Sequence, residues 1–93
     1  MPTLIEFDPS KNERNIAERG LSFDHASEFD FGTAVITEDV RRVYSEPRLV
    51  AVGYLADRLH VLCFTPTTVG IRVISFRKAN KREAIAHEKP LYR

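Results

Sequence analysis

Two arginines in a strand-like segment are the residues of this chain best suited to chemistry. Residues 69–79 are rich in β-branched side chains and include Arg72 and Arg77. Alternation with a period of two predicts a strand that is largely apolar on both faces, with Arg72 on one face and Arg77 on the other. A buried guanidinium is costly unless it is paired or opens onto water. Each arginine is therefore either paired with a carboxylate or directed at a phosphate, which its fork of donors fits.

Other cations gather near the same segment. The formal net charge of the chain is only +1, so binding to nucleic acid cannot be argued from total charge. A local cluster still contributes affinity for phosphate, although the same pattern is typical of solvated surface. The candidate phosphate-binding residues outside the pair of arginines are Arg48, Arg58, Lys78 and Lys81.

The sequence lacks the patterns of several other kinds of site. The three histidines are far apart, the chain has one cysteine, and no HExxH, CxxC or Gly-rich phosphate loop occurs. We therefore predict no metal site and no cofactor. His60 lies in the middle of an alternating apolar run, so it is either a packed structural imidazole or a group that transfers protons.

The elements that must position these residues belong to one α+β domain over residues 1–93. Hydrophobic residues make up 43% of the chain and charged residues 29%, which is typical of a folded protein. The single Cys63 excludes an internal disulfide and favours a reducing compartment. No segment is long and apolar enough to cross a bilayer, so we expect a cytoplasmic protein with no membrane contact.

Turn and cap signals divide the chain into eight elements. Asp8-Pro9 and Gly20 delimit a first helix, Ser22 caps a second, and Asn80 caps a third that ends before Pro90. Two short connections join the last three strands into an antiparallel meander. We predict strands over 4–7, 33–37, 48–55, 59–65 and 69–77, and helices over 9–19, 23–29 and from 81 onward, with a charged connection over 38–47.

Four ordered segments resemble the BrnT toxins, the ribonuclease partners of a type II toxin–antitoxin pair. Residues 7–15 match an aromatic-Asp-Pro-x-Lys-x-x-x-Asn pattern, and residues 20–23 match a Gly-apolar-Ser-Phe element. Residues 48–53 resemble an arginine-led strand that ends in glycine, and residues 72–79 resemble an Arg-Ile-Ile-Ser-Ala-Arg-x-Ala signature. The resemblance spans nearly the whole chain.

The resemblance implies a RelE-like fold, in which two N-terminal helices pack on an antiparallel sheet and a short helix follows it. It also implies a metal-independent endoribonuclease that inhibits translation and is neutralised by a BrnA-like antitoxin, with a homodimer or a hetero-oligomer as the assembly. In the implied reaction the 2′-hydroxyl attacks its own phosphate. Arg72 and Arg77 would stabilise the developing charge, Lys11 would add a third cation, and His60 or Glu83 would transfer the proton.

A second hypothesis is a non-catalytic module of the same fold that binds RNA or a protein. The chain has Arg19 where BrnT toxins usually have histidine just before the glycine. A guanidinium stays protonated and cannot act as a base, which favours this alternative. A purely structural adaptor is the third option.

Overall fold

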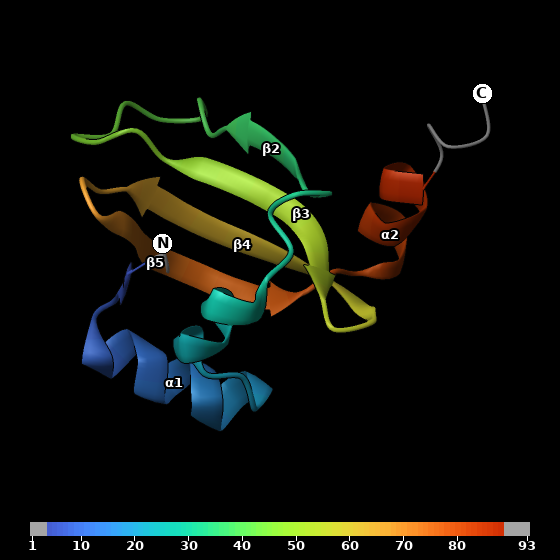
Figure 1. The fold of residues 1–93 in the computed structure, drawn as a ribbon, viewed down its shortest axis with the longest axis horizontal. Helices are drawn as coiled ribbons and strands as arrows, with labels where there is room; N and C mark the ends of the chain where they lie inside the picture. Colours follow the sequence, from blue (N-terminus) through green and yellow to red (C-terminus); the bar gives the residue numbers. More distant parts are fainter. Residues whose placement is uncertain (1–3, 89–93) are drawn as a thin grey trace.

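The computed structural model describes residues 4–88, in which five strands form one sheet (Figure 1). Strands β3 (Leu49–Leu55), β4 (Arg58–Pro66) and β5 (Gly70–Lys78) form the predicted antiparallel meander, and β2 (Val35–Glu38) pairs with β3 in antiparallel orientation. Strand β1 (Leu4–Glu6) completes the order β1-β5-β4-β3-β2. The expected connectivity of the meander is confirmed, and its central strand is β4.

The prediction of a wholly antiparallel sheet is wrong at β1. This strand pairs with β5 in parallel, so the sheet is mixed. Gly70 makes the pairing possible, because a Cβ atom at this position would lie 2.1 Å from the carbonyl oxygen of Leu4. The prediction failed because the pairing partner of β1 is remote in sequence, and no local pattern specifies its direction.

Helix α1 (Pro9–Arg19) has the predicted bounds and ends. The Asp8 side chain accepts a hydrogen bond from the amide of Ser10 at 2.9 Å, and Pro9 occupies the first turn. Gly20 closes the helix at φ 66°, and its amide donates to the carbonyl of Ile16. The second predicted helix is a 3-10 helix, η1 (Phe23–Glu28), capped by Ser22.

Two asparagines hold the polar helix α1 against the rest of the molecule. Asn15 is only 7% exposed, and its Nδ2 donates to the carbonyls of Leu21 and Phe76, each at 2.9 Å. Asn12 Oδ1 accepts a hydrogen bond from the amide of Phe23 at 2.7 Å. The apolar Ile16, in contrast, is 45% exposed. Most surface helices are held against the core by an apolar face, but α1 is held mainly by hydrogen bonds.

The hydrophobic core lies on the face of the sheet that α1 and η1 cover (Figure 1). Its largest fully buried side chains are Phe23, Phe76, Leu62 and Val73, which η1, β4 and β5 contribute. Helix α2 (Lys81–Glu88) lies at the far end of the sheet. Asn80 and Glu83 form the predicted capping box, since each side chain accepts a hydrogen bond from the other residue's amide. The expected end of α2 before Pro90 lies outside the described residues.

A bulge in β5 changes which residues share a face. Phe64 of β4 pairs with Val73, but Cys63 pairs with Ser75, so Ile74 is an extra residue in β5. The prediction that Arg72 and Arg77 lie on opposite faces is therefore wrong. Side chains alternate between the two faces of β5 before Ile74 and again after it, but the alternation is interrupted at Ile74 itself.

Among residues 4–88, no helix has the length and hydropathy that crossing a membrane requires.

Candidate functional site

The second face of the sheet is the one that α1 and η1 leave uncovered, and we call it the open face. Directly paired residues on neighbouring strands project to the same side. The pairs Val61–Arg77, Cys63–Ser75 and Thr65–Arg72 therefore share this face. Val50 and Thr37 continue it across β3 and β2. The bulge thus brings both candidate catalytic arginines to one surface.

Arg77 is held by the first turn of α2. Its Nη1 and Nη2 atoms donate to Oε1 and Oε2 of Glu83 at 2.8 and 2.7 Å. The side chains are 37% and 28% exposed. Hydrogen bonds from Arg77 lower the pKa of Glu83 to about 2, and those to Glu83 raise the pKa of Arg77. Glu83 is consequently a carboxylate with little tendency to accept a proton while this pair is intact.

Arg72 lies nearer the other end of β5 and has looser partners. Its Nη1 donates to Oε1 of Glu46 at 3.2 Å, and its Nη2 lies 3.7 Å from Oε1 of Glu6. All three side chains are 40–58% exposed. Exposed ion pairs of this kind contribute about 1 kcal/mol or less, so a phosphate could displace either carboxylate at small cost.

The two guanidinium groups do not converge on one point. Arg77 lies five positions after Arg72, which corresponds to roughly 15 Å along a strand with one bulge. Their carboxylate partners also come from different elements, Glu46 from the β2–β3 loop and Glu83 from α2. In this arrangement the two arginines could contact different phosphates of one strand.

The charged connection over 38–47 is an ordered loop built around Asp39, whose side chain is only 2% exposed. This carboxylate accepts hydrogen bonds from Nε and Nη2 of Arg41 at 2.9 and 2.8 Å and from the hydroxyl of Tyr44 at 3.0 Å. The hydrogen bonds from Arg41 hold the pKa of Asp39 well below its usual range. The amide of Asp39 donates to the carbonyl of Arg48, which closes the loop.

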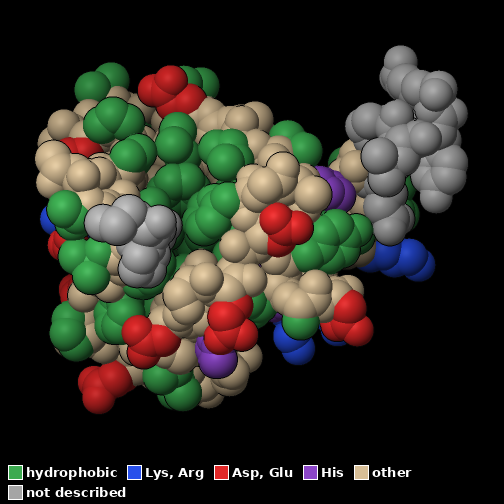
Figure 2. Space-filling model, in the orientation of Figure 1, with side chains coloured by type: hydrophobic (Ala, Val, Ile, Leu, Met, Phe, Trp, Pro, Cys, Tyr) green, Lys and Arg blue, Asp and Glu red, His purple; other side chains and the backbone are tan. Residues whose placement is uncertain are grey.

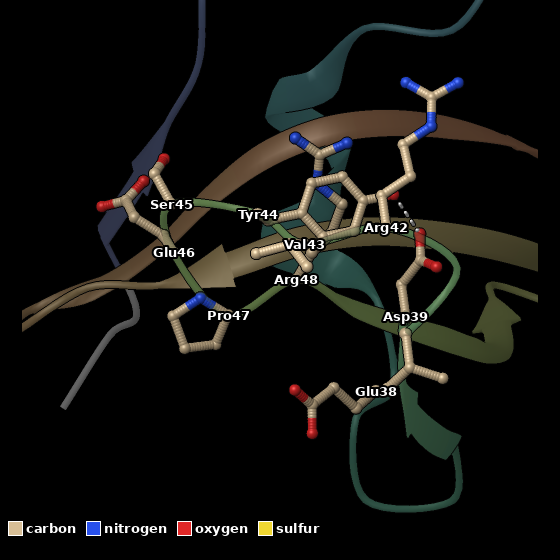
Figure 3. Close-up of a pocket in the computed structure, with 10 residues that line it drawn as sticks. Glu38, Asp39, Arg42, Val43, Tyr44, Ser45, Glu46, Pro47 and Arg48 are labelled. Atoms are coloured by element: carbon tan, nitrogen blue, oxygen red, sulfur yellow. Dashed lines mark hydrogen bonds between the residues drawn. The ribbon is translucent and has the colours of Figure 1, made fainter.

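Tyr44 and Arg48 form the most distinctive contact of this loop (Figure 3). The guanidinium carbon of Arg48 lies 4.0 Å from the centroid of the Tyr44 ring, which is a cation–π contact. Arg42 extends away from the ring. These side chains line an open pocket of about 440 Å³ between Glu38 and Arg48.

A second hollow of about 560 Å³ lies over the middle of the open face. Cys63 and Ser75 line its floor, and Arg77 and Glu83 line one side. Burial raises the pKa of the Cys63 thiol, so this sulfur is not an activated nucleophile. Among residues 4–88, no group of three or more His, Cys, Asp or Glu side chains could hold a metal ion.

His60 and Lys11 lie away from the open face. His60 pairs with Lys78 and packs against Phe76, on the side of the sheet that holds the core. It is 4% exposed, and this burial lowers the pKa of its imidazole. Lys11 projects from α1 and lines a small hollow with Arg19 and Ser75. The structure therefore does not bring these two candidates together with Arg72 and Arg77.

The remaining predicted phosphate-binding residues divide between the two faces. Arg48 reaches the loop beside the open face, as described above. Lys78 pairs with His60, and Arg58 lies two residues before His60 on β4, so both project to the core side of the sheet. Lys81 is exposed at the first position of α2.

The sequence alone did not single out the residues that organise the loop, Asp39, Tyr44 and Glu46. An Asp-x-Arg spacing is common in loops, and nothing in it indicates a buried carboxylate. On the side of the molecule shown in Figure 2, hydrophobic and acidic side chains are prominent, and few Lys and Arg side chains are in view. The placement of single cations therefore matters more than overall charge.

Comparison with known proteins gives one family match. A family model described as the ribonuclease toxin BrnT of type II toxin–antitoxin systems matches residues 7–83 of the 93. No curated protein matches the chain. The matched residues include the whole sheet from β2 to β5, α1, η1, and both candidate arginines.

Proposed function

The chain belongs to the BrnT family of ribonuclease toxins, and from this premise we propose that its open face binds single-stranded RNA and cleaves it without a metal ion. The observation that carries the proposal is that Arg72 and Arg77 share the face of β5 that α1 and η1 do not cover. Both head groups are partly exposed, and Arg72 is held only by exposed carboxylates. A phosphate backbone lying along β5 would meet both of them.

In the proposed reaction the 2′-hydroxyl of a ribose attacks the adjacent phosphorus. The O2′–P bond forms and the P–O5′ bond breaks, with the proton of the hydroxyl passing to a carboxylate and the O5′ atom taking a proton from solvent. Arg72 stabilises the charge on the non-bridging oxygens. Glu46 is the proposed proton acceptor, because it lies 3.2 Å from Arg72 on an exposed loop. Glu83 is poorly suited to this role, because it lies at Arg77, roughly 15 Å along β5 from the reacting phosphate at Arg72.

Arg77 takes a second phosphate of the same strand in this proposal. The separation of the two arginines along β5 is too large for one phosphate to receive both in the present arrangement. Binding therefore exchanges Glu83 for a phosphate oxygen at Arg77. His60 and Lys11, which the sequence also suggested as catalytic, have no part in this mechanism, because His60 projects to the core side of the sheet and Lys11 lines a separate hollow beside α1.

The proposed biological role is based on the family membership. A ribonuclease toxin that cuts messenger RNA would inhibit translation, and a BrnA-like antitoxin would neutralise it by covering the open face. The proposal treats residues 1–93 as one toxin domain with a RelE-like fold. Co-expression with a candidate antitoxin, followed by pull-down, tests the partner. A toxin that stays active in the complex would contradict a covered active face.

The experiment that tests catalysis is incubation of the purified chain with single-stranded RNA in excess EDTA. We expect cleavage to persist in the chelator, and 2′-O-methyl RNA to stay intact because it lacks the attacking hydroxyl. Arg72→Ala should lower the cleavage rate by about 10²-fold, the usual effect of removing a donor to developing charge. The products should carry a 2′,3′-cyclic phosphate.

Matched variants make this test specific. Arg14→Ala removes an exposed arginine from α1, on the other side of the sheet, and should leave the rate unchanged. His60→Phe and Lys11→Ala test the two candidates that the structure separates from the arginines. Full activity of Arg72→Ala would contradict the mechanism, and loss of cleavage in EDTA would contradict metal independence.

A binding module without catalysis is the second candidate function. Two observations favour it. His60 is buried on the core side of the sheet, and hydrogen bonds from Arg77 hold the Glu83 carboxylate. Under this alternative, RNA is retained on the chain with intact strands in the same assay. The two candidates are thus distinguished in one experiment.

A further inference from the structure

We propose that Tyr44 forms a subsite in which an unstacked base of the bound RNA lies against the tyrosine ring. The inference rests on the proposed function and extends it from the phosphates to a base. It concerns a loop to which the sequence assigned no role in catalysis. Aromatic rings are the usual platforms for bases of single-stranded RNA, because every base presents a flat π-face.

The ring of Tyr44 is fixed before any ligand binds. Its hydroxyl donates to Oδ2 of Asp39 at 3.0 Å, and that carboxylate is itself buried and held by Arg41. The guanidinium of Arg48 lies 4.0 Å from the ring centroid and covers one face of the ring. A base stacking on the other face would therefore meet a ring that loses little freedom on binding.

The pocket beside Tyr44 has a suitable size and composition. Its volume of about 440 Å³ is within the usual range for sites that bind small molecules. It opens to solvent, and Arg42 and Arg48 contribute cations to its lining. Arg48 can receive a phosphate next to the stacked base.

The subsite also continues the surface that carries Arg72. Glu46 lines the pocket and contacts Arg72 at 3.2 Å. The next residue, Pro47, accepts a hydrogen bond from Thr65, which pairs with Arg72 across the sheet. A strand whose phosphate lies at Arg72 therefore needs to extend by only a short distance to place a base at Tyr44.

The test uses the absence of tryptophan from the chain. Tyr44→Trp places a single fluorescent indole at the proposed subsite, and Tyr54→Trp places one on β3 at a site outside the proposal. The ligand is a 2′-O-methyl oligouridylate, which binds without being cleaved. We expect the oligomer to quench emission of Tyr44→Trp and to leave Tyr54→Trp unaffected. An abasic oligomer of the same length should cause no quenching.

Affinity gives an independent measurement. Tyr44→Ala should weaken binding of the oligouridylate about tenfold, whereas Tyr44→Phe, which keeps the ring, should bind within about threefold of the wild type. Thermal melting of both variants checks that they are folded. The abasic oligomer should bind wild type and Tyr44→Ala equally.

Equal quenching by the abasic and complete oligomers, or unchanged affinity in folded Tyr44→Ala, would overturn the subsite. If cleavage still depends on Arg72 in that case, the proposed function stands and only the subsite fails. If the wild-type chain neither binds nor cleaves RNA, the proposed function fails and the subsite fails with it.

Discussion

Single residues of the open face show how cations can be kept near the surface of a protein with little net charge. Arg72 and Arg77 each contact carboxylates, and Arg48 contacts an aromatic ring. The ion pairs differ in strength. The partners of Arg72 are single, exposed contacts, whereas Arg77 makes two short hydrogen bonds to one less exposed carboxylate. A ligand phosphate would therefore displace the partners of Arg72 more easily than Glu83.

Asn15 shows a structural role for a residue that belongs to the resemblance with BrnT toxins. Its amide joins α1 to the carbonyls of Leu21 and Phe76, and its Oδ1 accepts a hydrogen bond from Arg19 at 3.2 Å. Arg19, the last residue of α1, thus helps to orient the Asn15 side chain. These hydrogen bonds are a structural reason for the Asn of the pattern.

Asn15→Ala should destabilise the chain by about 2 kcal/mol, because two buried carbonyls lose their donor. Unfolding in urea, followed by circular dichroism, measures this change. Arg14→Ala, an exposed substitution on the same helix, is the control and should change stability by less than about 0.5 kcal/mol. Equal stability of the two variants would mean that α1 is held by other contacts.

At the scale of elements, local signals predicted most of the fold. Asp8, Pro9 and Gly20 fixed the ends of α1, and Asn80 with Glu83 fixed the start of α2. These signals can be read from the sequence because a capping residue bonds only the unpaired backbone groups in the first or last four residues of its own helix. The pairing of β1 and the bulge at Ile74 were missed, since both depend on strands that are distant in sequence.

The site was predicted less completely than the fold. Arg72 and Arg77 were identified from their unusual position in an apolar strand, but the bulge decided that they share a face. Tyr44 and Asp39 were not identified, because their contacts form only when the loop closes. Alternation placed His60 correctly on the central strand, and burial shows that its side chain faces the core.

The pair between Arg77 and Glu83 predicts a pH dependence of stability. Folding lowers the pKa of Glu83 from 4.5 to about 2, so the folded chain binds fewer protons than the unfolded chain between these values. The contribution of the pair is complete above pH 4.5 and is lost as the pH falls toward 2. With solvent screening it should be on the order of 1 kcal/mol.

Urea unfolding of wild type and Glu83→Gln across pH 2–7 measures this contribution. The variant should be less stable at pH 7 and approach wild type near pH 2. Glu13→Gln, on the exposed surface of α1, is the control and should parallel wild type throughout. A constant difference between wild type and Glu83→Gln at all pH values would contradict the ionic origin of the effect.

The whole molecule carries a formal net charge of only +1, which limits long-range attraction to RNA. Affinity must then come from local exchange of carboxylates for phosphates at the open face. For single-stranded nucleic acid, the logarithm of the binding constant falls by about 0.7 per phosphate contact for each tenfold rise in salt concentration. Three contacts, at Arg48, Arg72 and Arg77, predict a slope of about −2.

Titration of 2′-O-methyl RNA at several salt concentrations tests this number of contacts. Arg77→Ala should reduce the slope by about 0.7, and Arg14→Ala should leave it unchanged. A slope far steeper than −2 would indicate that cations outside the open face also contact RNA.

The additional residue in β5 makes segment length adjustable at one point of the sheet. Removing Ile74 would restore strict alternation and leave Ser75, Phe76 and Arg77 opposite the same residues of β4. Phe76 would stay in the core, and Arg77 would keep its face. An engineered chain should therefore tolerate the loss of one residue here better than at a regular position of β4, where a one-residue shift would move every following side chain to the other face.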